Sequence, residues 1–534
     1  MGRRMKHIRF GLFAAAAIAG VALHVSHAPA LAEEKTVIRS IPIGNLRVLY
    51  PIWTTAYITR NHAYMVWDTL FALDADNKPQ PQMVDTWEVS PDKLTYSFKL
   101  RDGLKWHDGP PVTAKDCVAS IRRWAAKDGM GRTLLDFATS LEAKDDKTFT
   151  LVLKQPVGFV IEALAKIDSN VPFMMPERLA RTDPNEQIKE VIGSGPFRFV
   201  ASEWVPGSKV IYEKFNDYVP RKEPASQAAG GKVVKVDRVE SVYMPDAGVA
   251  MAAIANGEID LHESPATDLL SLVEKNPNVV IEPNDPLGYG LFMVLNHLHP
   301  PFDKKEVRQA VLWGIKQTDF MATVVGDPKR YQSCAAIFGC GVPNESSAGA
   351  EPLMNPNVAK AKKMIADAGA AGARILLLDP ADNSTLHPAA LMGAQALRAM
   401  GFDVNVQAMD WSTVTQRRAS KAKPAEGGWN VFITNTTVTG ISNPLVHNFV
   451  KNCEQAWYGW PCDPRIVEQT RAWALETDEA KRKEIIEDLQ RLHLENVSYV
   501  PLGQYKPAII YRKELKGVIR GPAIFYWNIE KTRS

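Results

Sequence analysis

The chain has 534 residues, of which 63 are lysine or arginine and 60 are aspartate or glutamate, giving a formal net charge of +3. This near balance offers no argument for nucleic acid or an anionic membrane surface as a partner. Strand and helix patterns mix without a repeat of 20–50 residues, so the chain is neither a solenoid nor a propeller. A chain of this length is expected to divide into more than one lobe.

The N-terminus has the pattern of a secretory signal peptide. Four basic residues precede an apolar run over residues 10–23, and an A-x-A cleavage site ends at Ala32. The run is shorter than the roughly 20 residues that a bilayer span needs. Arg3 and Arg4 leave the twin-arginine route as an alternative to general secretion. Cleavage would leave 59 basic and 60 acidic side chains, and we expect a mature chain located in the periplasm without membrane insertion.

Strand, turn and helix signals follow one another closely between residues 95 and 124. Residues 95–100 alternate apolar and polar side chains with the period of a half-buried strand. Residues 101–103 then turn the chain. Thr113, with Asp116 three positions later, has the pattern of a capping box for a helix that runs through Trp124.

The second half of the chain also carries helix and strand signals. Asp303 is the expected N-cap of an amphipathic helix whose apolar face begins at Val307. Asn355 is the expected cap of a helix that ends at Gly369. An α/β unit is expected next, made of a strand over 374–379, a helix over 389–400 and a strand over 404–407.

All five cysteines follow the expected cleavage point. Cys334 and Cys340 lie six positions apart, and Cys453 and Cys462 lie nine apart. An oxidising compartment favours two disulfides, each closing a short loop worth about 2–3 kcal/mol in the chain-entropy model. Metal binding is the alternative, but no C-x-x-C pair or histidine partner has ligand spacing. Cys117 is left as a buried thiol.

Motifs of common enzyme classes are missing from the sequence. It contains no G-x-S-x-G, no H-E-x-x-H, no Walker loop and no G-x-G-x-x-G after a strand. His297 and His299 alternate in a proline-rich loop without a third ligand nearby. We therefore expect no catalytic residue, cofactor or metal. A secreted hydrolase, or a sensory or chaperone receptor, remains the alternative.

Several sequence blocks, taken in order, resemble family 5 of the solute-binding proteins of ATP-driven importers, the large peptide and nickel type. These blocks are residues 68–124, 193–197, 245–260, 300–310, 355–369 and 400–402. The resemblance implies an α/β, two-lobed periplasmic binding protein fold of the class II or cluster C type. It further implies an extra subdomain inserted in lobe I and a two-strand hinge.

The resemblance also implies a domain organisation and a function. The expected parts are a signal peptide over 1–32, lobe I with its insertion over 33–288, lobe II over 289–504, and a segment over 505–534 that returns to lobe I. Hinge crossings are expected near 288–295 and 500–505. The implied function is the periplasmic substrate-binding component of an ABC importer. As a monomer, it would capture a peptide-like or other polar organic solute between the lobes and deliver it to the permease subunits.

Ligand-binding residues are expected where strands end beside the cleft, because ligands of open α/β sheets collect at strand C-termini. A cleft also needs aromatic walls and a few orienting polar groups. The candidates outside the 429–444 segment are Trp53, Thr55, Tyr57, His262, Glu263 and, at the expected hinge, Tyr289.

The segment 429–444 resembles the family segment in which peptide binders carry an aspartate for the ligand's ammonium group. Here it contains no acidic residue. A buried ammonium without a counter-charge is costly, so the segment favours a neutral or anionic solute, and another carboxylate such as Glu263 is the alternative partner. The candidates for binding are Trp429, Asn435, Thr436 and Thr437.

Overall fold

The computed structural model describes residues 35–476 and 478–532. From Thr36 onward the chain forms one compact unit. The expected signal peptide, residues 1–32, lies outside the described residues.

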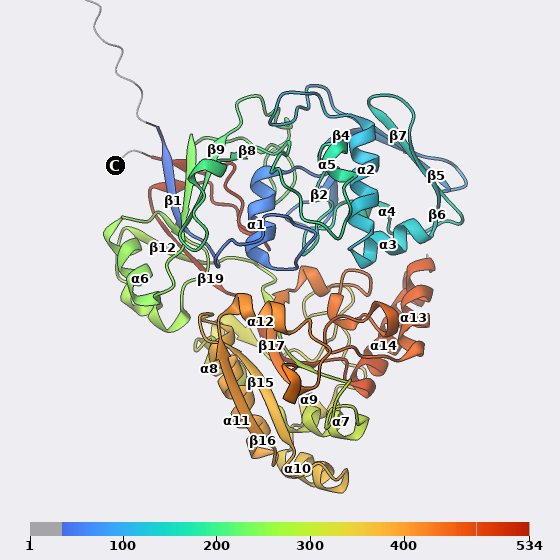
Figure 1. Ribbon diagram of the computed structural model, residues 1–534, viewed down its shortest axis with the longest axis vertical. Coiled ribbons are helices and arrows are strands. Elements are labelled where there is room, and N and C mark those ends of the chain that lie inside the picture. Colours follow the sequence, from blue (N-terminus) through green and yellow to red (C-terminus); the bar gives the residue numbers. More distant parts are fainter. Residues whose placement is uncertain (1–34, 477, 533–534) are drawn as a thin grey trace, which may run out of the picture. The chain divides into compact units, whose positions relative to one another are not determined.

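A mixed seven-stranded sheet contains the first strand of the chain at its centre (Figure 1). Its β1 is parallel to both neighbours, β10 and β11, whereas β19 is antiparallel to β11 and β12. Ile38 and Ile41 of β1 are buried. In order across the sheet, the strands are β12 (Val279–Pro283), β19 (Ala508–Arg512), β11 (Leu261–His262), β1 (Val37–Ile41), β10 (Arg238–Val242), β9 (Lys209–Lys214) and β8 (Phe197–Phe199).

An antiparallel four-stranded sheet lies within the sequence between β1 and β8. Its strands, in order, are β4 (Val84–Val89), β5 (Thr95–Leu100), β7 (Thr148–Leu153) and β6 (Ala138–Ala143). Helix α2 (Ala114–Ala125) packs against β6 and β7. The expected strand over 95–100 is confirmed, and so is the capping box, in which the Thr113 side chain and the Asp116 carboxylate each accept from the other residue's backbone N–H.

A six-stranded sheet is formed by the second half of the chain. Strand β13 is antiparallel to β17 and β18, whereas β15 is parallel to β16 and β17. Every residue of β13 is buried. Helix α11 (Leu386–Ala399) packs on β15, β16 and β17, and α8 (Gln317–Val324) packs on β18. The strands, in order, are β14 (Tyr331–Gln332), β18 (Val500–Tyr505), β13 (Tyr289–Leu295), β17 (Val431–Thr437), β15 (Arg374–Pro380) and β16 (Asp403–Met409).

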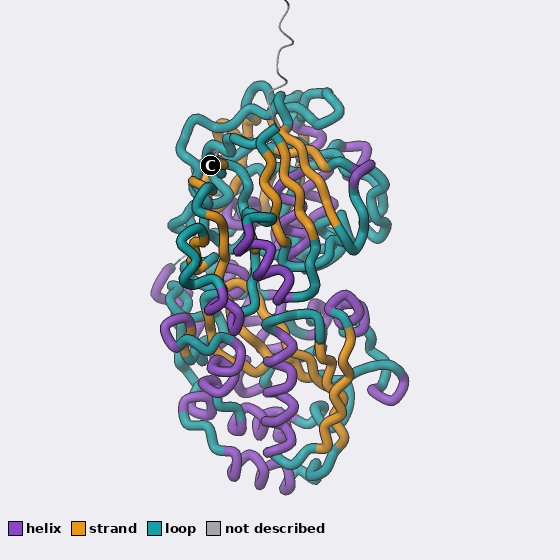
Figure 2. The backbone as a smooth tube through the Cα atoms, turned by 90° about the vertical axis from the view of Figure 1, so that its left-hand side faces the viewer, coloured by secondary structure: helices purple, strands orange, loops and turns teal. Residues whose placement is uncertain are grey.

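Helices and short hairpins complete the α/β architecture, with helices and strands interspersed throughout (Figure 2). The other helices are α1 (Tyr57–Val66), α3 (Gly129–Asp136), α4 (Val160–Leu164), α5 (Glu177–Ala180), α6 (Ala247–Asn256), α7 (Lys305–Gly314), α9 (Glu351–Met354), α10 (Val358–Asp367), α12 (Trp411–Arg417), α13 (Pro464–Leu475) and α14 (Glu479–Asn496). Two further strand pairs are β2 (Phe71–Leu73) with β3 (Pro79–Pro81), and β20 (Leu515–Lys516) with β21 (Glu530–Lys531).

The chain passes between the seven-stranded and six-stranded sheets twice. We call residues 36–283 and 508–532 lobe I, and residues 289–505 lobe II. The links run over 284–288 and 506–507, directly before β13 and directly after β18. Crossings were expected near 288–295 and 500–505. Those ranges are occupied by β13 and β18 of the six-stranded sheet, and the links adjoin them. Gly288 has φ +79° and lies so close to the Tyr505 carbonyl oxygen that a Cβ would be 2.2 Å from it, so the first link requires glycine at this point.

Three expected helix starts are wrong by one to three residues. The N-cap before α7 is Lys304 rather than Asp303, because residues 299–304 form a turn held by backbone hydrogen bonds. Asn357, rather than Asn355, caps α10 through a bond to the Lys360 N–H, because Asn355 already ends the short helix α9. Helix α11 begins at Leu386, three residues before the expected start.

Both expected disulfides are formed. The Cα atoms of Cys334 and Cys340 lie 6.0 Å apart, and those of Cys453 and Cys462 lie 4.1 Å apart. Cys117 is a free, buried thiol, as expected. Within the described residues, no helix has the length and apolar character of a membrane span.

Candidate functional site

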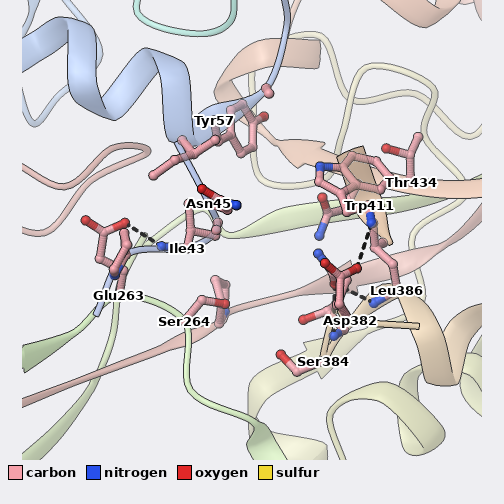
Figure 3. Close-up of a pocket in the computed structure, with 18 of the residues that line it drawn as sticks. Ile43, Asn45, Tyr57, Glu263, Ser264, Asp382, Ser384, Leu386, Trp411 and Thr434 are labelled. Atoms are coloured by element: carbon pink, nitrogen blue, oxygen red, sulfur yellow. Dashed lines mark hydrogen bonds between the residues drawn. The ribbon is translucent and has the colours of Figure 1, made fainter. Parts of the chain in front are cut away.

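A pocket of about 360 Å³ lies between lobe I and lobe II, within the volume range of small-molecule sites. Lobe I supplies the loops after β1 and β11 and the start of α1. Lobe II supplies strand β17 and the loops after β15 and β16. Figure 3 shows Glu263 on one side of this space and Asp382 on the other. The pocket thus collects strand C-terminal ends from both lobes.

Tyr57, the first residue of α1, links the two lobes. Its hydroxyl lies 2.5 Å from Thr436 Oγ1 and accepts a hydrogen bond from the Thr437 backbone N–H at 2.8 Å. The Tyr289 ring packs edge-on against the Tyr57 ring, with 5.8 Å between centroids. Burial raises the pKa of Tyr57 well above its usual value, so the hydroxyl stays protonated. Because the Thr436 hydroxyl donates to Asp168, Tyr57 is the donor to Thr436.

Asp168 of lobe I brings a carboxylate to the same place. Its Oδ1 atom lies 3.0 Å from Arg60 Nη1, and both side chains are buried. The hydroxyls of Thr436 and Thr437 donate to the Asp168 carboxylate at 3.4 and 3.1 Å. A Cβ at Gly440 would lie 2.2 Å from Asp168 Oδ2, so this close approach needs glycine. The threonines of the acid-free 429–444 segment therefore face a carboxylate from the other lobe, and that carboxylate is already paired with Arg60.

Asn435 and two tyrosines form another part of the pocket wall. Asn435 Nδ2 donates to the Tyr505 hydroxyl at 2.6 Å. The rings of Tyr505 and Tyr289 lie 6.0 Å apart between centroids. All three residues line the pocket. The two strands that adjoin the interlobe links thus place aromatic rings beside the site.

His262 and Glu263 line the pocket from the end of β11. Burial lowers the pKa of His262 to about 4, so the ring is neutral at pH 7. Burial raises the pKa of Glu263, whose carboxylate accepts hydrogen bonds from the Ile43 N–H at 3.0 Å, the Asn61 amide at 3.2 Å and the Tyr526 hydroxyl at 3.0 Å. These donors come from lobe I itself, so Glu263 is held in a fixed position.

Three of the expected ligand-binding residues do not line the pocket. Trp53 is 40% exposed, and the Lys127 ammonium lies 5.5 Å from its ring centroid. Trp429 is fully buried and packs against Phe432 with 4.9 Å between ring centroids. Thr437 is buried behind its neighbours and contacts Tyr57 and Asp168. Thr55 lines the pocket with the other expected residues.

Sequence reasoning missed several residues of the pocket wall. Asp382 and Trp411 follow β15 and β16, and the rule that singled out His262 after its strand would have found them too. Arg418 follows α12, and Trp457 lies in the loop closed by the second disulfide. No periodicity or motif marks these two residues in the sequence.

Histidines in the proline-rich loop are held by backbone atoms. His297 Nε2 lies 3.1 Å from the Val497 carbonyl oxygen, and His299 Nε2 lies 3.0 Å from that of Lys421. Across residues 35–476 and 478–532, no group of three or more His, Cys, Asp or Glu side chains is arranged to hold a metal ion.

Comparison with known sequences identifies a protein family and a relative that matches almost the whole chain. The profile described as bacterial extracellular solute-binding proteins, family 5 Middle, matches residues 78–452. The chain is 38% identical to a probable peptide ABC transporter periplasmic-binding protein of Sinorhizobium fredii. That match covers 98% of this chain and 99% of the relative.

Solved structures with the same fold carry different ligands. The periplasmic binding protein AgaA of A. tumefaciens R10, in complex with agropinic acid, superposes with a TM-score of 0.78 at 22% identity, over 93% of this chain and 99% of that one. A dipeptide-binding protein of Pseudoalteromonas sp. SM9913, in complex with Met-Leu, gives 0.79 at 18% identity, over 93% and 100%. Such identities show the fold alone, and they confirm the expected two-lobed α/β class. On the strength of the sequence matches, the chain belongs to the bacterial extracellular solute-binding proteins of family 5.

Proposed function

We propose that this chain is the substrate-binding component of an ABC importer. It captures a small polar solute in the pocket between its lobes and delivers the solute to membrane permease subunits. The observation that carries the proposal is the pocket itself, which is walled by both lobes and bordered by direct hydrogen bonds between them. The name of the Sinorhizobium relative supports the assignment to transport and to the periplasm.

Capture depends on the solute making more contacts with the closed state of the two lobes than with the open state. A solute that touches both lobes gains contacts only when the lobes are together, so it favours the closed state. A preference worth 1–3 kcal/mol shifts the docking equilibrium by roughly 5–150-fold. The links at 284–288 and 506–507 are short, and hinge motion there would leave the two large sheets intact. We propose lobe boundaries at these links, with a signal peptide over 1–32.

The charge arrangement favours a solute without a free ammonium group at the 429–444 segment. The carboxylate nearest to Thr436 and Thr437 belongs to Asp168, and Arg60 neutralises it. An incoming ammonium would have to displace the buried Arg60 guanidinium, which would leave a cation unpaired. The solute class proposed here is therefore neutral or anionic, in contrast to a peptide held by its amino terminus.

A binding screen on the mature chain tests the function. Protein recovered from its own periplasm is analysed by native mass spectrometry, and the identified solute is added back in a thermal-shift assay. Capture predicts an intact solute bound one to one and an unfolding temperature that rises with solute concentration. Recovery of cleaved products, with turnover of added solute, would contradict capture and indicate a hydrolase. If stabilisation required a free amino terminus, the argument from Asp168 would be wrong.

A further inference from the structure

Lys451 of lobe II meets lobe I at a second place, outside the pocket. It directly follows the short turn Asn448–Val450, and it does not line the pocket. Its ammonium lies over Gly129, the first residue of α3 in lobe I, where a Cβ would be 2.3 Å from Lys451 Nζ. At the other end of α3, the Arg471 guanidinium of lobe II lies 5.6 Å from the Phe137 ring centroid. The lobes therefore touch along α3 as well as at the pocket.

The Lys451 ammonium has few acceptors in this position. The side-chain oxygen of Asn448, from its own lobe, accepts from it at 2.6 Å. In the parts of the chain that the structure describes, none of its hydrogen bonds or ion pairs goes to a carboxylate. An ammonium has three N–H donors, so most of its hydrogen-bonding capacity is unused by the protein.

Asp128 of lobe I attracts this ammonium, but its carboxylate is already engaged. One oxygen accepts from the N–H groups of Met130 and Gly131 at 2.9 and 3.0 Å, and the other pairs with Lys166. Asp128 is 1% exposed and Lys166 is 4% exposed. A single buried carboxylate thus serves two lysines that come from opposite lobes.

Other groups around Lys451 repel its charge or leave it unbalanced. Lys166 and Arg132 of lobe I repel it, and the first turn of α3 carries the positive end of a helix dipole. In lobe II, His447 faces the same ammonium and stays neutral, because burial holds its pKa well below the usual value. The groups of lobe I act on Lys451 only while the lobes are together, so bringing a charged Lys451 to them costs free energy.

Proton loss removes that cost. Burial, together with Lys166 and Arg132, lowers the pKa of Lys451 from its ordinary 10.5 to about 8 against the attraction of Asp128. When the lobes separate, the side chain returns to water and to its ordinary pKa. Closure therefore releases a proton between pH 8 and 10.5, and it becomes more favourable as the pH rises through that window, by at most about tenfold per pH unit. Below pH 8 the side chain is charged in both states.

We propose that Lys451 opposes closure of the empty lobes for as long as its side chain is charged. At neutral pH the empty protein then stays open, and solute contacts must outweigh the cost of packing the ammonium against α3. The closed state consequently indicates a bound solute. This inference rests on the lobe closure of the proposed function, and it assigns a role in closure to a residue outside the pocket.

Single-molecule energy transfer on the mature chain, freed of bound solute by dialysis, tests the inference. The dyes are attached to Glu142→Cys in β6 and Glu468→Cys in α13, which are exposed positions on opposite lobes. Cys117 is buried and does not react with the dyes. The variants are Lys451→Met, which keeps an unbranched apolar stem, and Lys363→Met. Lys363 is 77% exposed on α10, so this control loses the same charge elsewhere in lobe II.

For wild type, we expect the ratio of closed to open molecules to rise at least about tenfold between pH 7.5 and pH 10. Lys451→Met should already have the higher ratio at pH 7.5 and change little with pH, whereas Lys363→Met should follow wild type. A wild-type ratio that does not depend on pH, or a Lys451→Met ratio that follows wild type, would overturn the inference. Fewer closed molecules in Lys451→Met would also overturn it, because Lys451 would then favour closure.

A substitution on the opposite lobe tests the contact itself. Gly129→Ala places a methyl group where the ammonium lies, and Gly129 has no left-handed backbone that alanine would strain. The flexible end of Lys451 should move into solvent, and the pH dependence of closure should fall to that of Lys451→Met. An unchanged pH dependence would contradict the assignment to this contact. Since no solute takes part, these results are separate from the native mass spectrometry that tests the proposed function.

Discussion

Two buried arginines lie near the same pocket, Arg60 in lobe I and Arg418 in lobe II. Arg60 has the Asp168 carboxylate at 3.0 Å, and it also donates to the Asn61 side chain and the Pro522 carbonyl. Arg418 has one threonine hydroxyl and a shell of aromatic rings. The first network is complete within the protein and supports contact between the lobes. The second is incomplete, because the Arg418 Nε has no hydrogen-bond partner within the described residues, and Arg418 lines the pocket.

Removing the carboxylate that pairs with Arg60 is expected to cause the largest loss of stability. Asp168→Ala leaves Arg60 buried without a counter-charge, as Arg418 is now, but without aromatic rings on all sides. We expect the free energy of unfolding to fall by about 3–5 kcal/mol, measured by urea denaturation. The double variant Arg60→Met/Asp168→Leu should recover most of the loss. If Asp168→Ala were as stable as wild type, the pair would not be the closed network described here.

A methyl group at Gly440 perturbs the same network more gently. A Cβ there would lie 2.2 Å from Asp168 Oδ2, whereas a Cβ at Gly44 would meet nothing within 4 Å. Gly440→Ala should therefore lower the free energy of unfolding by about 1–3 kcal/mol because the contact must shift. Gly44→Ala serves as the control and should change stability little. Equal effects of the two substitutions would contradict close packing at Asp168.

Buried histidines differ from the two buried arginines because a histidine can become neutral when it is buried, whereas an arginine stays charged. Burial lowers the pKa of His62 and His493 to about 3. Between pH 6.5 and about 3 the unfolded chain binds protons that the folded chain does not, so stability falls as pH falls. Each such histidine contributes a slope of about 1.4 kcal/mol per pH unit at most.

Urea denaturation between pH 7 and 5 measures that slope. In the same buffers, the slope for His493→Gln should be smaller than that for wild type by the contribution of one histidine. Stability that stayed flat over this range in wild type would show that the histidines are charged or exposed in the folded chain.

Tyr57→Phe has the smallest expected effect and tests the link between lobes. The variant loses the hydroxyl that donates to Thr436 and accepts from the Thr437 N–H. We expect solute affinity to weaken about fivefold, since a net hydrogen bond is worth about 1 kcal/mol. Tyr499→Phe is the matched control, because its hydroxyl donates to the Ile337 carbonyl inside lobe II. If both variants bound alike in calorimetry, Tyr57 would contribute nothing to closure.

Elements with strong local signals were predictable from sequence. The strand Thr95–Leu100 and the capping box at Thr113 depend on neighbours a few positions away, and both are formed as expected. The cap before α10 was misplaced because Asn355 and Asn357 have equal capping chemistry. Only the structure reveals the short helix α9 that Asn355 ends.

The pocket was predictable only where strand ends mark it. Both Tyr57 and His262 were expected where strands end beside the cleft. His262 is the last residue of β11, Tyr57 is the first residue of α1, and both line the pocket. Asp168 and Arg418 carry no such mark. Asp168 is paired with Arg60, 108 positions away, whereas Arg418 has no ion-pair partner within the described residues and donates only to Thr55 of the other lobe. Pairing over such distances is a property of the folded chain.

A crystal structure of the chain with its natural solute tests the central claim most directly. The account predicts an intact solute in the interlobe pocket, touching residues of both lobes, with the Arg60–Asp168 pair undisturbed. A solute that contacts a single lobe, or an ammonium group that takes Asp168 from Arg60, would contradict it.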